Sequence, residues 1–542
     1  MDSLALINGK VYVEKGKFAE AVYIEDGIIK VVGDSEEILG KTDWDTEIID
    51  CAGRTVIPGL NDSHMHMLMV GTGLMEVRTN DVTSIDDLVE RCRKYIEENP
   101  ELCKNGLYSC GYNEDLFTEG ERRFPDRHDL DRISTEIPVV MARVCGHVTS
   151  CNTKVIEMLG LGKDAKPWAG GTIVFGEDGL PSGVFTEQCG ERLHDTIPPH
   201  TKEDLKKAFN MAQDYAISKG LTSIQTNDVG ESELGMDALF ALIHEIYDSG
   251  EGKLRYRHQV ACYDPKELQH YIDTEWKNGK YEDPRRLALG PLKLFKDGSL
   301  GGRTALMRHE YLDDPGNYGV ESIDDETMDT MCKMAADAGM QVVTHSIGDA
   351  AIEKVTAAYE KVGANGINPL RHGIVHCQIT DKEMLQRIRD DNILVYYQPV
   401  FLDYDLHAVI PRVGRELSST SYAFKTARDM GIHCSYGTDS PVEDCNPFHC
   451  ICHAVTRKDT KGEPYFGFFP AECVSVEEAI DDYTIGSAYA EFAENFKGRI
   501  KSGYLADLLI LDTDIFSCDP MEIYDILPDV SIIGGEVVYE KK

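Results

Sequence analysis

The sequence predicts an α/β fold: a (β/α)8 TIM barrel, a small β-sandwich built from both termini, and an insertion after the first barrel strand. Three observations predict it. Short apolar runs alternate with helical patterns through the middle of the chain, as in barrels of parallel strands. Short strand-like runs also gather at both ends of the chain. About 160 residues separate the first two barrel strands, far more than a βαβ crossover needs.

The barrel strands are predicted from apolar runs bounded by turn residues. Helices are predicted between them: Thr201 and Asp204 open one that Gly220 ends, and Ser322 and Asp325 open another. Methionines at helical spacing in the second helix indicate core packing and not a cofactor site. The eight predicted strands are 55–62, 221–227, 254–263, 287–295, 340–345, 372–377, 393–399 and 432–438.

Both ends of the chain have the character of small antiparallel sheets. Asn8-Gly9 predicts a hairpin between two apolar runs, and Glu25-Asp26-Gly27 predicts a second. The apolar run 508–511 and a later one at 530–539 repeat this pattern. The predicted domains are a β-sandwich of residues 1–56 and 497–542, a barrel of residues 57–74 and 201–496, and an inserted subdomain of residues 75–200 that covers the mouth of the barrel.

Composition narrows the class of partner. The 55 basic and 94 acidic residues give a net charge of −39, which argues against nucleic acid or an anionic membrane. The N-terminus lacks a basic segment and a long apolar segment, and no apolar run reaches about 18 residues, so neither a signal peptide nor a membrane span is expected. Sixteen cysteines in such a chain indicate reduced thiols and a cytoplasmic location. We expect a small-molecule substrate, and the exposed sandwich is compatible with a homodimer.

His64 and His66 form the central motif, at the end of the first predicted strand. Side chains on a strand alternate between its faces, so two histidines one residue apart face the same side and can hold one metal ion. A solvated turn that carries two histidines is the alternative. The remaining strands decide between these two interpretations.

Residues suited to metal binding or proton transfer occupy the ends of four other predicted strands. Lys293 lies in the fourth strand, His345 ends the fifth, His376 ends the sixth and Asp439 follows the eighth. Barrels of this type carry their active sites at the C-terminal ends of the strands. Five strands that bring His-x-His, Lys, His, His and Asp to one mouth form a specific pattern, which favours the metal site.

This order of residues resembles the amidohydrolase superfamily of metal-dependent hydrolases. Several segments resemble amidohydrolase family 3, the branch that includes N-substituted formamide deformylase. The segments are 124–131, 145–152, 170–173, 179–184, 293–301, 345–349, 437–443, 498–500 and 503–508. They extend over nearly the whole chain, and the resemblance independently implies the split β-sandwich.

The resemblance also implies roles for the site residues. The implied metal ligands are His64, His66, Lys293, His345, His376 and Asp439. Lys293 would be carboxylated and bridge two ions, because a free ammonium repels a metal whereas a carbamate supplies two anionic oxygens. Metal-activated hydroxide would attack the substrate, with Asp439 as general base and then general acid. Zinc is the expected ion, at about one or two per chain, although the same ligands suit Mn, Fe or Co.

Alternatives stay open at several positions. Lys293 could be an unmodified lysine in a mononuclear site, and Glu187 could bind metal instead. Arg303, after the fourth strand, could clamp a substrate carboxylate or carbonyl, or form a loop salt bridge. His147 and Tyr112, in the insertion, are the other predicted substrate-binding residues. The resemblance places His147 toward the pocket and a tryptophan where Tyr112 stands, so this wall would be more polar here.

A dense run of thiols and imidazoles follows Asp439. It contains Cys445, His449, Cys450, Cys452 and His453. Tight zinc-knuckle spacing needs two separated pairs of ligands, and this is one run on a predicted helix. Buried reduced cysteines are therefore favoured over a structural zinc site.

The predicted function is hydrolysis of a C–N bond in an amide, formamide or cyclic amide, other than a peptide bond. A deaminase of the same superfamily is the first alternative. It ranks lower because Ser346-Ile347-Gly348-Asp349 follows His345, without the His-x-x-Glu common in deaminases. A catalytically inactive relative that binds a metabolite is the second alternative, and the retention of all six site residues argues against it.

Overall fold

The computed structural model describes residues 3–144, 147–232, 234–278 and 283–542. Cys145 and Gly146, which belong to one of the family-like segments, lie outside this description. The chain forms two compact units. We call residues Met1–Val70 with Phe209–Lys542 the main unit, and residues Gly71–Ala208 the inserted unit. No helix among the described residues is both long enough and apolar enough to cross a membrane.

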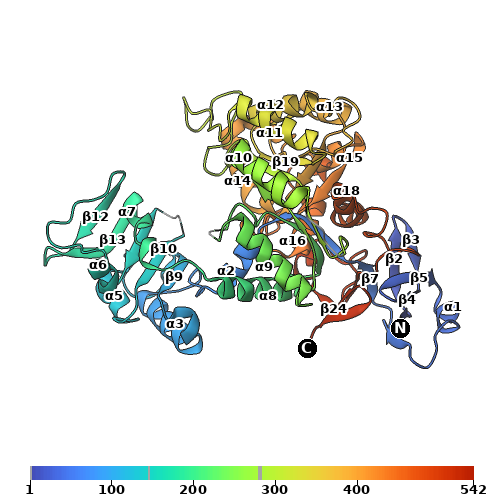
Figure 1. Ribbon diagram of the computed structural model, residues 1–542, viewed down its shortest axis with the longest axis horizontal. Helices are drawn as coiled ribbons and strands as arrows, with labels where there is room; N and C mark the ends of the chain where they lie inside the picture. Colours follow the sequence, from blue (N-terminus) through green and yellow to red (C-terminus); the bar gives the residue numbers. More distant parts are fainter. Residues whose placement is uncertain (1–2, 145–146, 233, 279–282) are drawn as a thin grey trace. The chain divides into compact units, whose positions relative to one another are not determined.

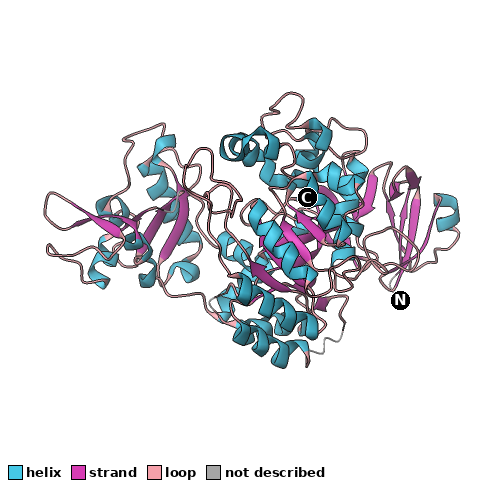
Figure 2. Cartoon of the chain, turned by 90° about the horizontal axis from the view of Figure 1, so that it is seen from above, coloured by secondary structure: helices cyan, strands magenta, loops and turns pink. Residues whose placement is uncertain are grey.

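Parallel strands form the centre of the main unit, in two sheets ordered β17-β15-β14-β8 and β16-β18-β19-β20-β21-β22. Figure 2 shows helices on either side of these strands. The third and fourth predicted strands are each broken in two, and the two pieces join different sheets. The strands are β8 (Leu60–Met65), β14 (Leu221–Thr226), β15 (Arg255–His258), β16 (Val260–Ala261), β17 (Leu287–Ala288), β18 (Leu292–Phe295), β19 (Val342–Ser346), β20 (Gly373–His376), β21 (Leu394–Tyr397) and β22 (Cys434–Tyr436).

Hydrogen bonds join the segment after the last parallel strand, β22, to the first, β8. The Asp439 amide donates to the His64 carbonyl at 2.8 Å, and the His66 amide donates to the Ser440 carbonyl at 2.7 Å. The buried carboxylate of Asp62 accepts from the amide and the hydroxyl of Thr438, at 3.0 and 2.7 Å. The carboxyl ends of β8 and β22 therefore meet, as a barrel of parallel strands requires.

Helices follow most of the parallel strands. Helix starts were predicted for two of them, α8 and α11. Thr201 and Asp204 open α8 as predicted, since each side chain accepts from the other residue's amide. The second helix, α11, is capped by Asp324 and not by Ser322: the Asp324 carboxylate accepts from the Thr327 amide at 2.8 Å. The helices are α8 (Lys202–Ser218), α9 (Met236–Asp248), α10 (Pro265–Tyr271), α11 (Asp325–Asp337), α12 (Asp349–Glu360), α13 (Lys382–Asp390), α14 (Leu402–Ser418), α15 (Phe424–Asp429) and α16 (Pro447–Thr456).

The terminal segments of the main unit form two further sheets, ordered β5-β4-β1-β6 and β25-β24-β23-β7-β2-β3. In the second sheet, strands from the N-terminus lie beside strands from the C-terminus (Figure 1). Side chains from both sheets share one buried core. The strands are β1 (Ser3–Ile7), β2 (Lys10–Glu14), β3 (Lys17–Ala19), β4 (Ala21–Glu25), β5 (Ile28–Gly33), β6 (Glu47–Asp50), β7 (Thr55–Pro58), β23 (Leu508–Leu511), β24 (Pro528–Ile533) and β25 (Glu536–Glu540).

Of the two predicted hairpins, only the one at Glu25-Asp26-Gly27 forms, as the β4–β5 pair. The hairpin predicted at Asn8-Gly9 is wrong. β1 is already paired on both sides, to β4 and β6, so β2 joins the other sheet. Asn8 supplies a left-handed backbone (φ 54°) at this crossing between sheets.

The first predicted barrel strand, 55–62, is also two strands. β7 pairs with β2 and β23 in a terminal sheet, whereas β8 pairs with β14 in a parallel sheet. The break falls at Gly59, where a Cβ atom would lie 2.2 Å from the Thr222 hydroxyl oxygen. Only glycine allows the chain to pass this close while it changes sheets.

The inserted unit has one sheet of its own, ordered β12-β13-β11-β10-β9. It is antiparallel except for the β9–β10 pair. Its strands are β9 (Leu107–Tyr112), β10 (Val139–Arg143), β11 (Val148–Cys151), β12 (Gly171–Phe175) and β13 (Pro181–Glu187), and its helices include α3 (Ile85–Glu98), α5 (Arg127–Asp131) and α6 (Thr153–Met158). Two apolar clusters of buried residues form its core.

Candidate metal centre

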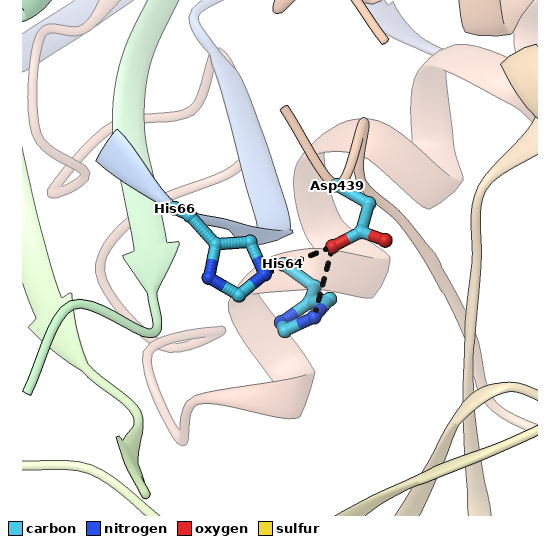
Figure 3. A group of neighbouring side chains, drawn as sticks. All are labelled: His64, His66 and Asp439. Carbon is cyan, nitrogen blue, oxygen red and sulfur yellow. Dashed lines mark hydrogen bonds and ion pairs between the residues drawn. The ribbon is translucent and has the colours of Figure 1, made fainter. Parts of the chain in front are cut away.

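Three side chains from the two meeting strand ends converge in the main unit. His64 lies in β8, His66 follows it, and Asp439 lies in the loop after β22. The Nε2 atoms of both histidines lie 3.2 Å from Oδ1 of Asp439 (Figure 3). One ligand atom from each residue lies within 4.8 Å of the other two. This is the one such group of three or more metal-binding side chains among the residues that the structure describes.

His345 and His376 form a second pair beside this group. Nδ1 of His345 lies 2.9 Å from Nε2 of His376, and the His376 ring lies 5.9 Å from the His64 ring, between centroids. The two residues come from adjacent parallel strands, β19 and β20, in which Ser346 is paired with His376. The structure thus brings all four predicted histidines to the same strand ends.

Outer hydrogen bonds fix the orientation of the imidazole rings. Nδ1 of His66 contacts the Asn227 carbonyl at 3.1 Å, and Nε2 of His345 contacts the Gly298 carbonyl at 3.0 Å. A carbonyl oxygen can only accept, so these outer nitrogens carry the protons. In the neutral form of each ring, the inner nitrogen then presents a lone pair to the centre, which is the form that binds a metal.

Lys293 lies in β18, fully buried. Its Nζ has no hydrogen-bond partner in the described part of the chain and lies 3.8 Å from the centroid of the Phe295 ring. Burial lowers the pKa of Lys293 to about 7, although the charges of Asp439 and Glu231 oppose this. An unsatisfied, readily deprotonated amine in this place suits carboxylation, since only a neutral amine reacts with carbon dioxide.

The charges at the centre are those of a cation site. Burial lowers the pKa values of His64 and His345 to about 4, so both rings are neutral at neutral pH. Burial raises the pKa of Asp439, but its contacts with His64 and His66 outweigh this and hold the pKa well below its usual value. Burial lowers the pKa of His66, but its hydrogen bond and charge interaction with Asp439 outweigh this and raise it. A divalent cation would take the place of the His66 proton beside the ionised carboxylate and the neutral rings.

The backbone at two of these residues is strained. Asp439 and His376 have φ values of 57° and 73°, in the left-handed region that non-glycine residues rarely adopt. Such conformations cost about 1 kcal/mol or more each and persist where surrounding contacts impose them. At Asp439, one such contact is the hydrogen bond from its amide to the His64 carbonyl.

The predicted substrate-binding residues have other partners in the structure. Arg303 forms the loop salt bridge, with two bonds to Asp313 at 2.8 and 3.1 Å. In the inserted unit, His147 contacts Glu187 at 3.0 Å. Tyr112 is buried in that unit's core, with its hydroxyl 3.2 Å from Ser150. Contacts of these residues with a substrate, and metal binding by Glu187, stay predictions.

The sequence analysis missed three polar residues that hold the histidines: Asn227, Gln259 and Gln398. Oε1 of Gln259 lies 2.6 Å from Nδ1 of His64, and Oε1 of Gln398 lies 2.8 Å from Nδ1 of His376. Gln398 lies next to the carboxyl end of a predicted strand, so the rule that selected His345 and Asp439 would have selected it, had amide side chains been included. Gln259 lies inside the third predicted strand, 254–263, and Asn227 contacts His66 through its main-chain carbonyl, which residue type does not predict.

Comparisons with known proteins identify the family of this chain. A family model described as the amidohydrolase family matches residues 47–539. A candidate amidohydrolase of Bacillus subtilis (strain 168), YtcJ, is 32% identical over 98% of this chain and 97% of its own length. N-substituted formamide deformylase of Arthrobacter pascens is 24% identical over 100% and 99%. The crystal structure of an uncharacterised metal-dependent hydrolase from Pyrococcus furiosus is 30% identical, covers 95% of this chain and 100% of that one, and has a TM-score of 0.77. The resemblance is confirmed: the chain belongs to the amidohydrolase family.

Proposed function

We propose that this protein is a metal-dependent hydrolase that cleaves a C–N bond in an amide, formamide or cyclic amide. One observation carries the proposal. Nε2 of His64 and Nε2 of His66 both lie 3.2 Å from Oδ1 of the ionised Asp439 carboxylate. Two imidazole nitrogens and a carboxylate oxygen that converge this closely are the ligand types and spacing of a divalent-metal site. The family membership supports the same chemistry.

We also infer the finer features of the fold. The parallel strands would close into a (β/α)8 barrel, and the two terminal sheets would form the β-sandwich. Support comes from the bonds between the ends of β8 and β22 and from the core that both terminal sheets share. We also propose that the inserted unit covers the mouth of this barrel.

The residues present fit one or two divalent ions. His64, His66 and Asp439 would hold the first, and His345 with His376 would hold the second. Lys293, if carboxylated, would bridge them, whereas an unmodified Lys293 would leave a mononuclear site. Zinc suits this set of nitrogen and oxygen ligands, as do Mn, Fe and Co. When bound, such ions polarise the substrate carbonyl and lower the pKa of water from 15.7 to about 7.

Asp439 is the proton carrier in this proposal. Its carboxylate is ionised, because the contacts with His64 and His66 keep its pKa well below the usual value. It would accept a proton from the attacking water and then deliver that proton to the leaving nitrogen. His66, whose ring lies against the same Oδ1, would hold the carboxylate in place during both transfers.

The test is a screen of amides, N-formyl compounds and cyclic amides against protein of measured metal content. We expect turnover of at least one of these classes, proportional to metal content and lost in Asp439→Asn. Turnover by metal-free protein, or equal turnover by Asp439→Asn, would refute the proposal. Release of ammonia from aminopurines without amide hydrolysis would favour the deaminase instead.

A further inference from the structure

We propose that Gln259 is a positioning residue of the metal centre. Its amide links the Ser63 carbonyl to the His64 ring and so determines which nitrogen of that ring faces the centre. This inference rests on the metal centre proposed above, and it concerns a residue with no metal-binding atom of its own in that centre.

The geometry places Gln259 directly behind His64. Gln259 is fully buried at the break between β15 and β16, inside the third predicted strand, 254–263. Its Nε2 donates to the Ser63 carbonyl at 2.9 Å, and its Oε1 lies 2.6 Å from Nδ1 of His64. The amide therefore bridges two neighbouring residues of β8 and ties the third strand to the first.

The hydrogen bond to Ser63 determines which way the Gln259 amide faces. A main-chain carbonyl can only accept, so the NH₂ group of Gln259 must face Ser63 and its Oε1 must face His64. Oε1 can also only accept, so Nδ1 of His64 carries the proton. Nε2 of His64 then presents its lone pair toward Asp439, 3.2 Å away. Gln259 thus holds His64 in the tautomer that binds a metal, with its ring aimed at the centre.

Gln398 provides an internal comparison. Its Oε1 makes the equivalent contact with Nδ1 of His376, at 2.8 Å. Its Nε2, however, has no hydrogen-bond partner among the described residues. Nothing anchors that amide, so its oxygen and nitrogen can exchange places by rotation and either tautomer of His376 can be accommodated. Gln259 should therefore contribute more to metal binding than Gln398.

The experiment compares zinc affinity across matched variants of the full chain, by competition with a chelator and by metal analysis of the purified holoenzyme. Gln259→Met keeps the length of the side chain and removes its acceptor. We expect it to weaken zinc binding by about 10- to 100-fold, the usual cost of losing a partner behind a metal-binding histidine. Gln259→Glu keeps an acceptor for Nδ1 of His64 but loses the donor to Ser63, so it should bind zinc more tightly than Gln259→Met. Gln398→Met should lose less affinity than Gln259→Met.

Gln225→Met is the control for loss of a buried amide. Gln225 lies in β14 and donates to the Ser487 carbonyl at 3.0 Å, without a contact to any of the four histidines. Its substitution should leave zinc affinity unchanged. Equal zinc affinity in Gln259→Met and Gln225→Met would overturn the inference. An equal loss of affinity in Gln259→Met and Gln259→Glu would also overturn it, because the acceptor facing His64 would then make no difference. Wild-type protein that binds no metal would refute the metal centre itself, which is a separate outcome.

Discussion

Two regions of the main unit are rich in metal-binding side chains, and only one of them gathers those side chains at a point. His64, His66 and Asp439 come from strand ends far apart in the sequence, yet their ligand atoms lie within 4.8 Å. The stretch 445–453 holds three cysteines and two histidines, mostly on α16. Cys450 bonds to the Gly437 carbonyl, Cys452 bonds to the Pro520 carbonyl, and the His449 ring stacks on Tyr524.

The difference follows from the geometry of the two elements. Successive side chains on a helix point in directions about 100° apart, so a dense run spreads around the axis. The carboxyl ends of parallel strands point to one mouth, so distant residues converge there. A high density of ligand types along the sequence is therefore weaker evidence for a metal site than single ligands at the ends of several strands.

The largest expected effect is at Asp439. Asp439→Asn removes the proton carrier and keeps the shape of the side chain, so kcat/KM should fall by about 10²- to 10⁴-fold. Metal content should stay close to that of wild type, because the amide oxygen can still coordinate. Steady-state kinetics with metal analysis of the same preparation measures both. Wild-type kcat/KM in this variant would remove Asp439 from the mechanism.

Metal removal should show which of the two regions binds metal. Chelation should abolish turnover, and added Zn²⁺ or Mn²⁺ should restore it. An ion at a thousandfold excess over its Kd stabilises the folded state by about 4 kcal/mol, so the apo-protein should melt at a lower temperature. His66→Ala should resemble the apo-protein in calorimetry. Cys452→Ala should respond to chelator as wild type does, and loss of metal in that variant would move the site to α16.

Lys293 should show a smaller, pH-dependent effect. If it is carboxylated, Lys293→Met should lower the metal content from about two ions per chain to about one. Because burial lowers the pKa of Lys293 to about 7, the neutral amine that reacts with carbon dioxide becomes more abundant as the pH rises through 7. Reconstitution of the apo-protein with metal and bicarbonate should therefore be more complete at about pH 8 than at about pH 6. Mass spectrometry that finds no carbamate and one ion per wild-type chain would contradict the bridge.

The smallest effect should follow substitution of the helix thiols. Cys450→Ala removes one buried sulfur and its bond to Gly437, and should cost about 1 kcal/mol of stability, as small cavities do. Metal content and kcat/KM should not change. Thermal unfolding and metal analysis check this, and a metal content below that of wild type would show that α16 takes part in binding.

The sequence predicted where most parallel strands lie, because apolar runs between turn residues mark buried strands whatever their neighbours are. It did not predict which sheet each strand joins. Thr55–Pro58 and Leu60–Met65 are equally buried, and nothing local shows that Gly59 separates two sheets. Asn8-Gly9 likewise carries a hairpin signal, which the two partners of β1 override.

At the candidate site, the sequence likewise predicts which residues take part but not how their atoms are protonated. His64, His345 and Asp439 could be chosen by residue type and strand position. Their tautomers and charges depend on what lies behind each ring, such as the Asn227 carbonyl and the Gln259 amide. Glutamine has no distinctive sequence signature, so its contribution appears only in three dimensions.

The position of β7 has a consequence for the order in which the protein assembles. β7 leads through Gly59 into the strand that carries His64, and its sheet partner on one side is β23, residues 508–511. The Gly59 amide also donates to the Asp507 carbonyl at 2.8 Å. On the ribosome, His64 and His66 emerge long before the segment that anchors β7 is translated. A nascent chain therefore carries the first part of the proposed centre unsupported, and we expect any metal loading to follow the emergence and docking of residues 507–511.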